Sequence, residues 1–485
     1  MTDTIPSSRT PLRMLVAVAS YGTSNDRHLL RLIEEYRSMA FALTIVVLSD
    51  RHKQLRRDVE IRVGLPDKNP WSLPFAHKEI FAERLEDFDL FVYSEDDILI
   101  TEKNLRSFLK VSENVQEDEL PGFIRFESDA DGQISYPDVQ FHFHWTPTSV
   151  VSRGLYKLAN FTNDHAACYA LTQPQLRKAL VSGGFLIGPQ EWRYDLLCSA
   201  ATDPYTRCGF TKLIPISHLD DFLVHHLSNK YAGKFGISDA EMRLQIDELL
   251  QIEKSRIATA PLVRAETNLW HATYSKDYYE PACEEILSRI PSHIRSVLSI
   301  GSGWGATERR LVERGIRVVA MPLDTVISRT AAAAGVEIVH GDFDELAPML
   351  KEERFDCALL LNVLHFFRDP VAVLAACKEI LPVGATIMIQ APNMLCVSNI
   401  LRRYRRPSRY RGLGTYELAG VHTTSPATIR RWCKAAGLKA DTTVGLSREK
   451  RDMFYDRVRG AAREIVPDVV MQALAPDFIA VTHKH

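Results

Sequence analysis

Three consecutive carboxylates, Glu95, Asp96 and Asp97, directly follow the apolar run 90–94. Such a run predicts a buried strand, and open α/β sheets bind ligands beyond the carboxyl ends of their strands. Adjacent carboxylates repel one another unless a cation lies among them. Because Mg²⁺ and Mn²⁺ prefer oxygen ligands and bridge diphosphates, the triplet predicts a metal site that would stabilise a diphosphate leaving group. The alternative is a solvated acidic turn that caps the next helix.

A glycine-rich run forms the second candidate site. Residues 301–306, Gly-Ser-Gly-Trp-Gly-Ala, lie between an apolar strand pattern at 296–300 and a helical pattern at 306–314. Glycines let the backbone turn tightly and approach a ligand closely. The dinucleotide-binding pattern G-x-G-x-x-G does not fit, because Ala306 takes the place of its last glycine. Alone, the run is a weak signal that depends on the elements around it.

Two series of alternating strand and helix patterns position these sites. The first series alternates along residues 14–20, 26–39, 43–49, 75–84 and 90–94. The second begins near residue 295, with further strands expected at 317–321, 336–340, 357–361, 386–390 and 477–482. Strand–helix–strand order implies parallel sheets with right-handed crossovers. We therefore expect an α/β fold with two Rossmann-like sheets.

The remaining patterns indicate where the two sheets separate. Helical patterns recur near 173–182, 191–200 and 219–228, whereas the aromatic- and His-rich stretch 118–165 is expected to be loop-rich. A polar helical pattern over 238–257 is interpreted as a bridging helix. We expect domains at residues 12–235 and 270–485, joined by a helical linker at 236–269.

Composition and charge bound the class of protein. Hydrophobic residues make up 46% and charged residues 25%, as in ordinary globular proteins. The formal net charge of −2 gives no broad attraction to nucleic acid, so no nucleic-acid partner is expected. The cysteines form no C-x-x-C pair, which argues against a zinc site or a disulfide framework.

Targeting signals are weak. The N-terminal stretch is polar without an apolar signal core, and no run of about 18 apolar residues occurs. The expectation is a cytoplasmic protein with at most peripheral contact at the inner face of the membrane. The basic run from Arg402 to Arg411 is either a solvated loop or a binding site for a phosphate, an anionic glycan or a membrane surface.

The segments 77–81 and 87–98 resemble the GT-A class of glycosyltransferases, which carries a D-x-D type motif after a buried strand. The resemblance extends in organisation over about residues 12–230, although this chain has E-D-D in place of D-x-D. It implies a GT-A fold, a nucleotide-diphosphate sugar as donor, and Mn²⁺ or Mg²⁺. It makes Asp97 a direct metal ligand and lets Asp96 or Glu95 contact metal or ribose. His226, with His225 close behind, would be a late metal ligand.

The same resemblance implies further roles. Ser20 and Tyr21, after the first strand, would contact the base and ribose of the nucleotide, and Asp50 would make a similar contact. Glu191 would be the carboxylate that takes the proton from the acceptor hydroxyl. Asp195 follows one helical turn later, so both acids could share one helix face. An ordinary surface helix is the alternative.

The second series resembles class I S-adenosylmethionine-dependent methyltransferases over about residues 270–485. The resemblance rests on 297–306, on Gly341-Asp342 after a strand, and on 355–370. It implies that the glycine-rich turn lines the methionine part of the cofactor, that Asp342 binds the adenine amino group, and that Asn362 lies beside the methionyl end. The full predicted cofactor set is Gly301, Ser302, Gly303, Gly305, Asp324, Asp342, Phe343 and Asn362.

Two departures from that family stand out. Ser299 occupies a position where the family often has an acid, and the acid expected at Pro322 to hold the ribose appears two residues later as Asp324. Methyl transfer to oxygen is helped by a base, for which His365 and His422 are the candidates, with a structural role as the alternative for each.

Together these features predict a bifunctional glycan-modifying enzyme. One unit would transfer a sugar to a glycan or glycolipid acceptor, and the other would methylate a hydroxyl of the same glycan. A second hypothesis makes the N-terminal unit a non-catalytic glycan-binding module. A third makes the C-terminal unit a degenerate scaffold, on the strength of Ser299 and the displaced Asp324.

Overall fold

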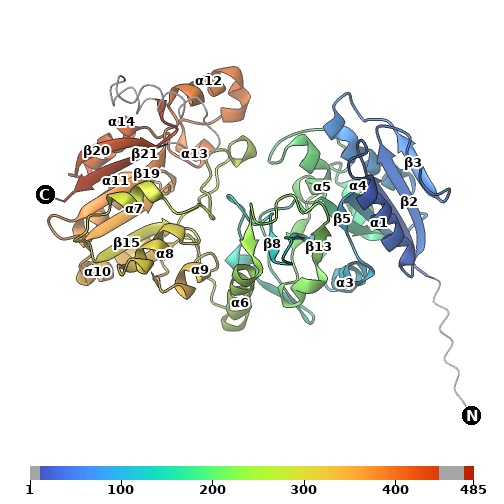
Figure 1. The fold of residues 1–485 in the computed structure, drawn as a ribbon, viewed down its shortest axis with the longest axis horizontal. Helices are drawn as coiled ribbons and strands as arrows, with labels where there is room; N and C mark the ends of the chain where they lie inside the picture. The colour runs from blue at the N-terminus through green and yellow to red at the C-terminus, as the bar shows by residue number, and fades with distance from the viewer. Residues whose placement is uncertain (1–10, 447–473, 485) are drawn as a thin grey trace, which may run out of the picture. The chain divides into compact units, whose positions relative to one another are not determined.

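A computed structural model of the 485-residue chain describes residues 11–446 and 474–484. The chain divides into two compact units (Figure 1). Unit 1 comprises Met1–Val139 and Phe143–Arg256, and unit 2 comprises Gln140–His142 and Ile257–His485. Each unit is built on its own sheet, as the two series of strand patterns predicted.

The main sheet of unit 1 has the strand order β11-β4-β1-β2-β3. The strands β1 (Arg13–Ala19), β2 (Ala42–Ser49), β3 (Val59–Val63) and β4 (Leu90–Glu95) are parallel, and β11 (Cys168–Thr172) runs antiparallel to β4. β1 is almost wholly apolar because both of its faces are buried. Since β2 and β4 flank β1 on opposite sides, the chain reverses its direction across the sheet at the carboxyl ends of these strands, where a ligand crevice forms.

Helices and a second sheet complete unit 1. The helices are α1 (Asp26–Ser38), α2 (His77–Glu83), α3 (Glu102–Ser112), α4 (Gln173–Val181), α5 (Leu196–Thr206) and α6 (Asp239–Ser255). The second sheet, ordered β14-β8-β7-β13-β5, contains β5 (Ile98–Leu99), β7 (Ile124–Ser128), β8 (Ile134–Tyr136), β13 (Leu223–His226) and β14 (Ile237–Ser238). Two small ladders pair β6 (Glu119–Pro121) with β12 (Thr211–Leu213), and β9 (Val151–Arg153) with β10 (Tyr156–Leu158).

The helix patterns at 219–228 and 238–257 have outcomes that differ from the predictions. The predicted helix over 219–228 was wrong, because a 3-10 helix at Ile216–Asp221 leads into strand β13, which is held by pairing with β5 and β7. The helix predicted to bridge the domains is α6. It begins with a capping box between Ser238 and Glu241 and buries Met242 and Leu249 within unit 1.

The sheet of unit 2 has the order β17-β16-β15-β18-β19-β21-β20. Its parallel strands are β15 (Ser296–Ser302), β16 (Arg317–Pro322), β17 (Glu337–Ile338), β18 (Cys357–Leu361) and β19 (Thr386–Pro392). β21 (Asp477–His483) is antiparallel to β19 and to β20 (Lys439–Leu446). The strand predicted at 336–340 is therefore present but shorter.

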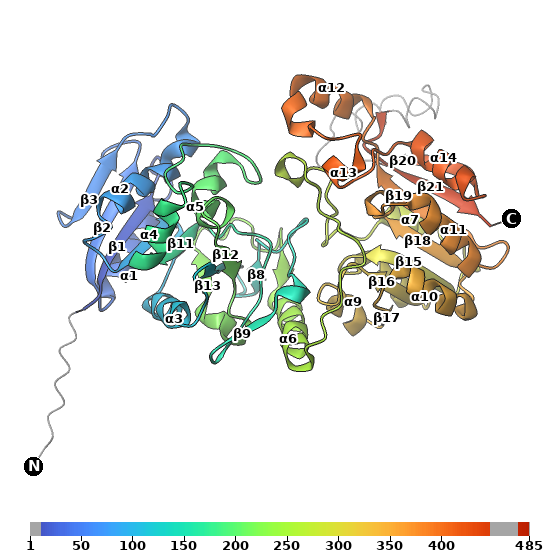
Figure 2. The same cartoon turned by 180° about the vertical axis from the view of Figure 1, so that it is seen from behind.

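Helices cover both faces of this sheet (Figures 1 and 2). On one face, Val297 and Leu359 pack against α7 (Glu284–Arg289), α8 (Ala306–Glu313) and α9 (Arg329–Ala333). On the other face, Leu298 and Leu360 pack against α10 (Phe343–Leu350), α11 (Pro370–Ile380) and α14 (Pro426–Ala435). Successive residues of one strand thus enter opposite core layers, which explains the unbroken apolar runs. The remaining helices of unit 2 are α12 (Val397–Arg405) and α13 (Tyr416–Ala419), and Ala419 of α13 belongs to the same core cluster as Leu298.

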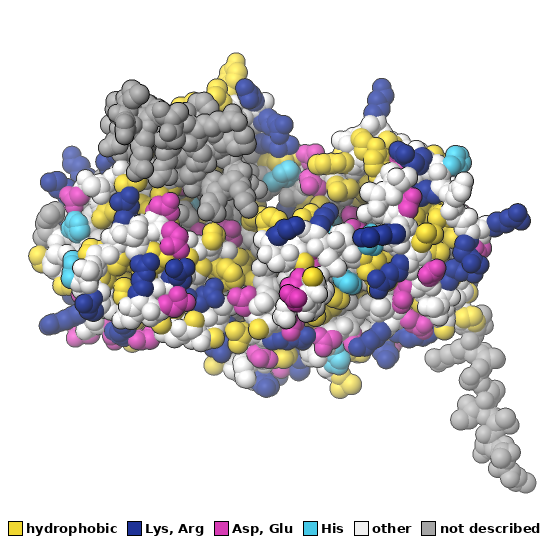
Figure 3. Space-filling view, in the orientation of Figure 1, with side chains coloured by type: hydrophobic (Ala, Val, Ile, Leu, Met, Phe, Trp, Pro, Cys, Tyr) yellow, Lys and Arg dark blue, Asp and Glu magenta, His cyan; other side chains and the backbone are white. Residues whose placement is uncertain are grey.

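Shorter elements and the surface complete the description. Further 3-10 helices lie at Pro70–Ala76, Pro147–Ser149, Trp270–Ala272, Lys351–Glu353, Leu364–Phe366 and Pro407–Tyr410. Within the described ranges no helix combines the length and apolarity needed to cross a lipid bilayer. On the visible face of each unit, basic side chains are interspersed with acidic ones (Figure 3).

Candidate active sites

The glycine-rich turn of unit 2 joins β15 to α8. Gly301 and Gly305 have positive φ angles of 72° and 80°, which L-residues rarely adopt. Gly303 is required for a different reason, because a Cβ at this position would lie 2.2 Å from the carbonyl oxygen of Tyr278. The loop before β15 therefore packs directly on the turn, and the backbone N–H of Trp304 donates to the same carbonyl at 2.9 Å.

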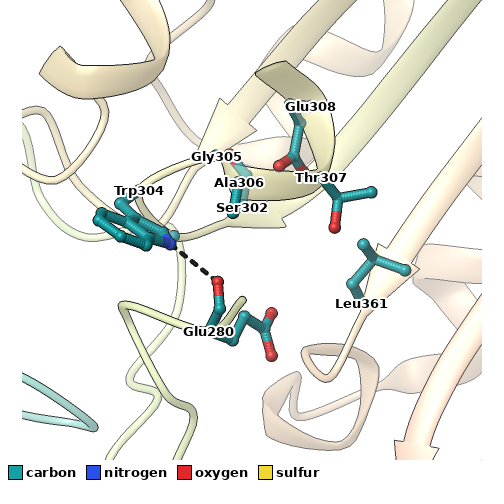
Figure 4. Close-up of a pocket in the computed structure, with 9 residues that line it drawn as sticks. Glu280, Ser302, Trp304, Gly305, Ala306, Thr307, Glu308 and Leu361 are labelled. Carbon is teal, nitrogen blue, oxygen red and sulfur yellow. Dashed lines mark hydrogen bonds between the residues drawn. The ribbon is translucent and has the colours of Figure 1, made fainter. Parts of the chain in front are cut away.

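A pocket opens beside this turn (Figure 4). The pocket is lined by the turn, the start of α8, the end of β18 and the loop before α7. The lining residues are Glu280, Ser302, Gly303, Trp304, Gly305, Ala306, Thr307, Glu308 and Leu361. Among the described residues no partner is found for the buried Ser302 Oγ, nor for the buried Oδ1 of Asn362. Buried polar atoms are normally hydrogen-bonded, so both indicate a missing ligand. S-adenosylmethionine, expected from the family resemblance, has polar groups that suit these atoms.

Asn362 follows β18 and is held in a fixed orientation. Its φ of 52° is left-handed, and its Nδ2 donates to Glu280 Oε2 at 2.9 Å. Glu280 also accepts a hydrogen bond from the buried Lys276 ammonium. This contact fixes the amide and leaves its buried oxygen, which has no partner among the described residues, available to a ligand.

Asp324 lies immediately after β16 with a different set of contacts from those expected of a ribose ligand. Its side chain is 4% exposed, and Oδ1 accepts from the backbone N–H groups of Val326 and Ile327, each at 2.8 Å. Burial raises the pKa of Asp324 to about 7, although these two N–H groups oppose the shift. The geometry is that of an Asx turn that orders the loop before α9.

The adenine-side candidates follow β17. Asp342 is exposed and precedes α10, whereas the Phe343 side chain is 4% exposed and belongs to the core beneath that helix. Gly341, with a φ of 150°, allows the chain to turn between them and the strand. The pocket at the glycine-rich turn has neither residue in its lining.

The two candidate bases are neighbours through the backbone. The N–H of His422 donates to the carbonyl oxygen of His365 at 2.9 Å. The ring of His422 stacks on Tyr416, and its Nε2 lies 3.1 Å from the carbonyl oxygen of Arg368. Since a carbonyl only accepts, Nε2 carries a proton and Nδ1 retains the lone pair. His365 is 1% exposed, so His422 is the more accessible of the two.

In unit 1 the three acids of the triplet have different surroundings. Asp96 accepts from Ser20 Oγ at 2.6 Å and from Asn25 Nδ2 at 2.8 Å. Burial raises the pKa of Glu95 to about 8, and its buried Oε1 has no partner among the described residues. For Asp97, burial acts to raise the pKa, but the hydrogen bond and charge of His226, together with Ser228 and Lys230, outweigh it and lower the pKa of this carboxyl.

His226 is brought to the triplet by strand pairing. In the β13–β5 ladder His226 lies opposite Ile98, the residue after Asp97, and its Nε2 is 3.0 Å from Asp97 Oδ2. Its other ring nitrogen, Nδ1, hydrogen-bonds to the fully buried carboxylate of Glu127. Because a carboxylate only accepts, Nδ1 donates to Glu127, and this leaves Nε2 beside both Asp97 Oδ2 and Ser228 Oγ, the latter at 2.8 Å. His225 lies on the opposite side of the strand, with its ring stacked on Phe126.

A preformed metal site with four protein ligands is not present. No group of three or more His, Cys, Asp or Glu side chains in the described part of the chain is arranged to hold a metal ion. Both Asp96 oxygens already accept hydrogen bonds, and Asp97 Oδ2 and His226 Nε2 are hydrogen-bonded to each other. Because a histidine must be deprotonated to bind a metal, an ion held by this pair would replace the hydrogen bond between the two side chains.

The predicted nucleotide contacts lie at the carboxyl ends of β1 and β2. Ser20 is fully buried against Asp96, whereas Tyr21 is 49% exposed. Asp50 accepts from the backbone N–H of Gly22 at 2.8 Å, and a hydrogen bond from Arg51 lowers the pKa of the Asp50 carboxyl. The loops after β1 and β2 are thereby tied together beside the triplet.

Glu191 and Asp195 do not share a helix face. Glu191 lies in the loop before α5, and that helix begins only at Leu196. Asp195 is its N-cap residue, and Oδ1 accepts from the backbone N–H of Cys198 at 2.9 Å. The predicted helix at 191–200 started too early because the acidic cap was included in the helical pattern.

Four polar residues near the sites were not foreseen. Asn25 and Glu127 contact the triplet and its histidine, while Glu280 and Glu308 line the pocket of unit 2. Glu127 and Glu280 reach their partners only through tertiary contacts and have no local motif. Glu308 could have been found from the sequence. It lies about one helical turn after the glycine-rich run, in a chain that has Ser299 where the family often has an acid.

Comparisons with known proteins concern unit 2. A family model described as a methyltransferase domain matches residues 298–389, a segment that contains the glycine-rich turn, Asp342 and Asn362. The ubiquinone biosynthesis O-methyltransferase of Xylella fastidiosa (strain 9a5c) is 25% identical over 171 residues, covering 34% of this chain and 69% of that protein. The protein of that name from Azotobacter vinelandii is 25% identical over 172 residues, covering 33% and 72%. A solved S-adenosylmethionine-dependent methyltransferase from Archaeoglobus fulgidus aligns with 41% of this chain and 90% of its own at 14% identity, with a TM-score of 0.30.

Proposed function

Since unit 2 is a class I S-adenosylmethionine-dependent methyltransferase domain, we propose that it methylates a hydroxyl oxygen, and that the acceptor is a sugar or glycan. The related proteins from Xylella fastidiosa and Azotobacter vinelandii are O-methyltransferases of ubiquinone biosynthesis, and this supports an oxygen acceptor. The glycan acceptor rests on the glycosyltransferase resemblance of unit 1. One observation carries the proposal. Two buried polar atoms beside the glycine-rich turn, Ser302 Oγ and Asn362 Oδ1, have no hydrogen-bond partner among the described residues.

The chain's own residues would hold the cofactor and the proton. When bound, the cofactor supplies an electrophilic methyl group on its sulfonium, so the protein mainly has to position the acceptor. Ser302 and Asn362 would bind the amino-acid end, with Glu280 fixing the amide of Asn362. His422 would accept the hydroxyl proton at Nδ1, because its Nε2 is committed to a backbone carbonyl.

Binding and transfer can be tested separately on the full-length protein. Calorimetry with S-adenosylhomocysteine should give a single site per chain, and Asn362→Leu should weaken it at least about tenfold. Labelled S-adenosylmethionine should then transfer its methyl group to saccharides with free hydroxyls. Transfer to amines or phenols alone would refute the glycan acceptor while leaving the methyltransferase intact. If S-adenosylhomocysteine does not bind at any concentration, the result would favour the hypothesis that unit 2 is a degenerate scaffold.

For unit 1 we propose metal-dependent transfer of a sugar from a nucleotide-diphosphate donor. The observation that favours it is the meeting of Asp97 and His226 at the carboxyl end of β4, with the imidazole held by Glu127. A divalent ion there would be held by these two side chains and would stabilise the charge that develops on a diphosphate leaving group. Ser20 would fix Asp96 beside it.

The competing hypothesis, a non-catalytic glycan-binding module, makes different predictions. A thermal-shift screen of nucleotide-diphosphate sugars with Mn²⁺ should show stabilisation of the wild type. Asp97→Asn combined with His226→Ala should abolish that shift and all donor hydrolysis, with methylation by unit 2 unchanged. Stabilisation by glycans but by no nucleotide sugar would support the binding module.

Both activities on one chain would serve one acceptor. A product released by unit 1 meets the second active site at a high effective concentration because the units are covalently linked. A glycolipid acceptor would bring the chain to the membrane surface, where the basic α12, with Arg402, Arg403 and Arg405 in its last turn, could contact phosphates. Comparing methylation of tethered and free acceptors would test the coupling.

A further inference from the structure

The acid that is missing from β15 is supplied from helix α8. At the family's usual acidic position this chain has Ser299, whose Oγ donates to Glu308 Oε1 at 2.6 Å. Both side chains are buried, at 1% and 3% exposure. A carboxylate therefore lies within hydrogen-bonding distance of the strand position although it comes from the first turn of the next helix.

The second oxygen of this carboxylate faces the glycine-rich turn. Glu308 Oε2 lies 3.8 Å from the point where a Cβ on Gly305 would stand. Glu308 lines the pocket together with Ser302, whose buried hydroxyl has no partner among the residues that the structure describes. Figure 4 shows Glu308 at the start of α8 and Glu280 on the loop, both lining the same pocket.

The two pocket acids differ in how their charges are compensated. Glu280 is paired with the Lys276 ammonium and accepts from Asn362. Glu308 accepts from the Ser299 hydroxyl and from its own backbone N–H, and the Lys276 ammonium acts on it without a direct ion pair among the described residues. A buried carboxylate is costly unless it is paired with a cation, so Glu308 is suited to receive a positively charged ligand group.

We infer that Glu308 binds the ammonium group at the methionyl end of the cofactor, in place of the acid usually found on the strand. The inference rests on the use of S-adenosylmethionine by unit 2. Ser299 then acts as a positioning residue, since its hydroxyl fixes Oε1 and leaves Oε2 for the ligand. The departure at Ser299 is thus compensated within one strand–turn–helix unit, β15 to α8.

The test compares two ligands that differ in the amino-acid end. S-adenosylhomocysteine carries the ammonium group, whereas 5′-methylthioadenosine keeps the adenosine and thioether but lacks it. Glu308→Gln preserves the size of the side chain and the hydrogen bond from Ser299. Calorimetry should show the Kd of S-adenosylhomocysteine raised about 10- to 100-fold and that of 5′-methylthioadenosine unchanged within twofold.

Two further variants keep the test decisive. Glu313→Gln, at the exposed end of the same helix, removes an equal charge and should bind both ligands like the wild type. Ser299→Asp combined with Glu308→Gln returns the acid to the strand and should restore S-adenosylhomocysteine binding, which also covers the case in which Glu308→Gln alone folds poorly. Equal weakening of both ligands, or no weakening of either, would overturn the inference. No binding of S-adenosylhomocysteine by the wild type would instead overturn cofactor use itself.

Discussion

Replacing Asp324 by Asn separates a structural role of this residue from the cofactor role expected from sequence. Its carboxyl is buried and accepts two backbone N–H groups, from Val326 and Ile327. An Asn amide oxygen can accept the same two bonds without bringing a charge into the interior. If the Asx turn is its whole function, Asp324→Asn should stabilise unit 2 and leave the affinity for S-adenosylhomocysteine unchanged.

The size of the effect follows from the pKa of Asp324, which burial raises from 3.8 to about 7. As pH rises above 3.8 the unfolded chain loses this proton first, while the native state retains it until about pH 7, so stability falls across that window and levels off above it. At about 1.4 kcal/mol per pKa unit, the penalty reaches about 4 kcal/mol near neutral pH. The advantage of the Asn variant should grow by about 2–3 kcal/mol between pH 5 and pH 8.

The measurement is a thermal melt of the full chain at several pH values, following the transition that S-adenosylhomocysteine shifts. For a unit of this size the gain corresponds to about 5–10 °C between the two pH extremes. Asp369→Asn is the matched control, because Oδ1 of this exposed N-cap also accepts two backbone N–H groups, at 3.0 Å, and its replacement should shift nothing. A pH-independent effect of Asp324→Asn, or a large loss of ligand affinity, would refute the reasoning.

Three further predictions concern other sites. Gly303→Ala should destabilise unit 2 by about 3 kcal/mol, because the new Cβ would lie 2.2 Å from a backbone carbonyl oxygen. Gly315→Ala, whose Cβ would meet only open space, should cost about 1 kcal/mol of backbone strain, and melting curves of the two variants test the difference. Lys78→Met should cost about 3–5 kcal/mol by leaving the buried Asp203 carboxylate unpaired, and adding Asp203→Leu should recover most of that loss in denaturant unfolding of unit 1. Glu127→Gln should weaken Mn²⁺ binding, measured by calorimetry with Mn²⁺ alone, about tenfold, because the amide holds the imidazole less strongly; unchanged affinity would contradict a metal at that site.

The sequence predicted the parts of the fold that depend on local patterns. The strands at 14–20 and 296–300 were recognisable because parallel strands buried on both faces form unbroken apolar runs. The turn after Ile300 was recognisable because glycine is needed where φ is positive, as at Gly301 and Gly305. These two features placed both sheets and the ends at which ligands would bind.

What the sequence could not give depends on contacts between distant segments. Strand β13 has only four residues, and its pattern Leu-Val-His-His suits a helix as well as a strand until β5 and β7 pair with it. The role of Glu127 is apparent only from its hydrogen bond to His226, and that of Asp195 only from its position as the N-cap residue of α5. The two backbone hydrogen bonds of Asp324 were not apparent in the sequence, and its contact with the cofactor stays a prediction.

The pairing that joins His226 to Asp97 spans 129 residues of chain. During synthesis at about 5–20 residues per second, the acids leave the ribosome roughly 6–26 s before the histidine is made. For that interval a nascent chain carries three neighbouring carboxylates with no imidazole beside them, and it would hold a divalent ion only weakly. The metal proposed for unit 1 would therefore bind only after β13 has been translated, and it would not serve as a nucleus for early folding.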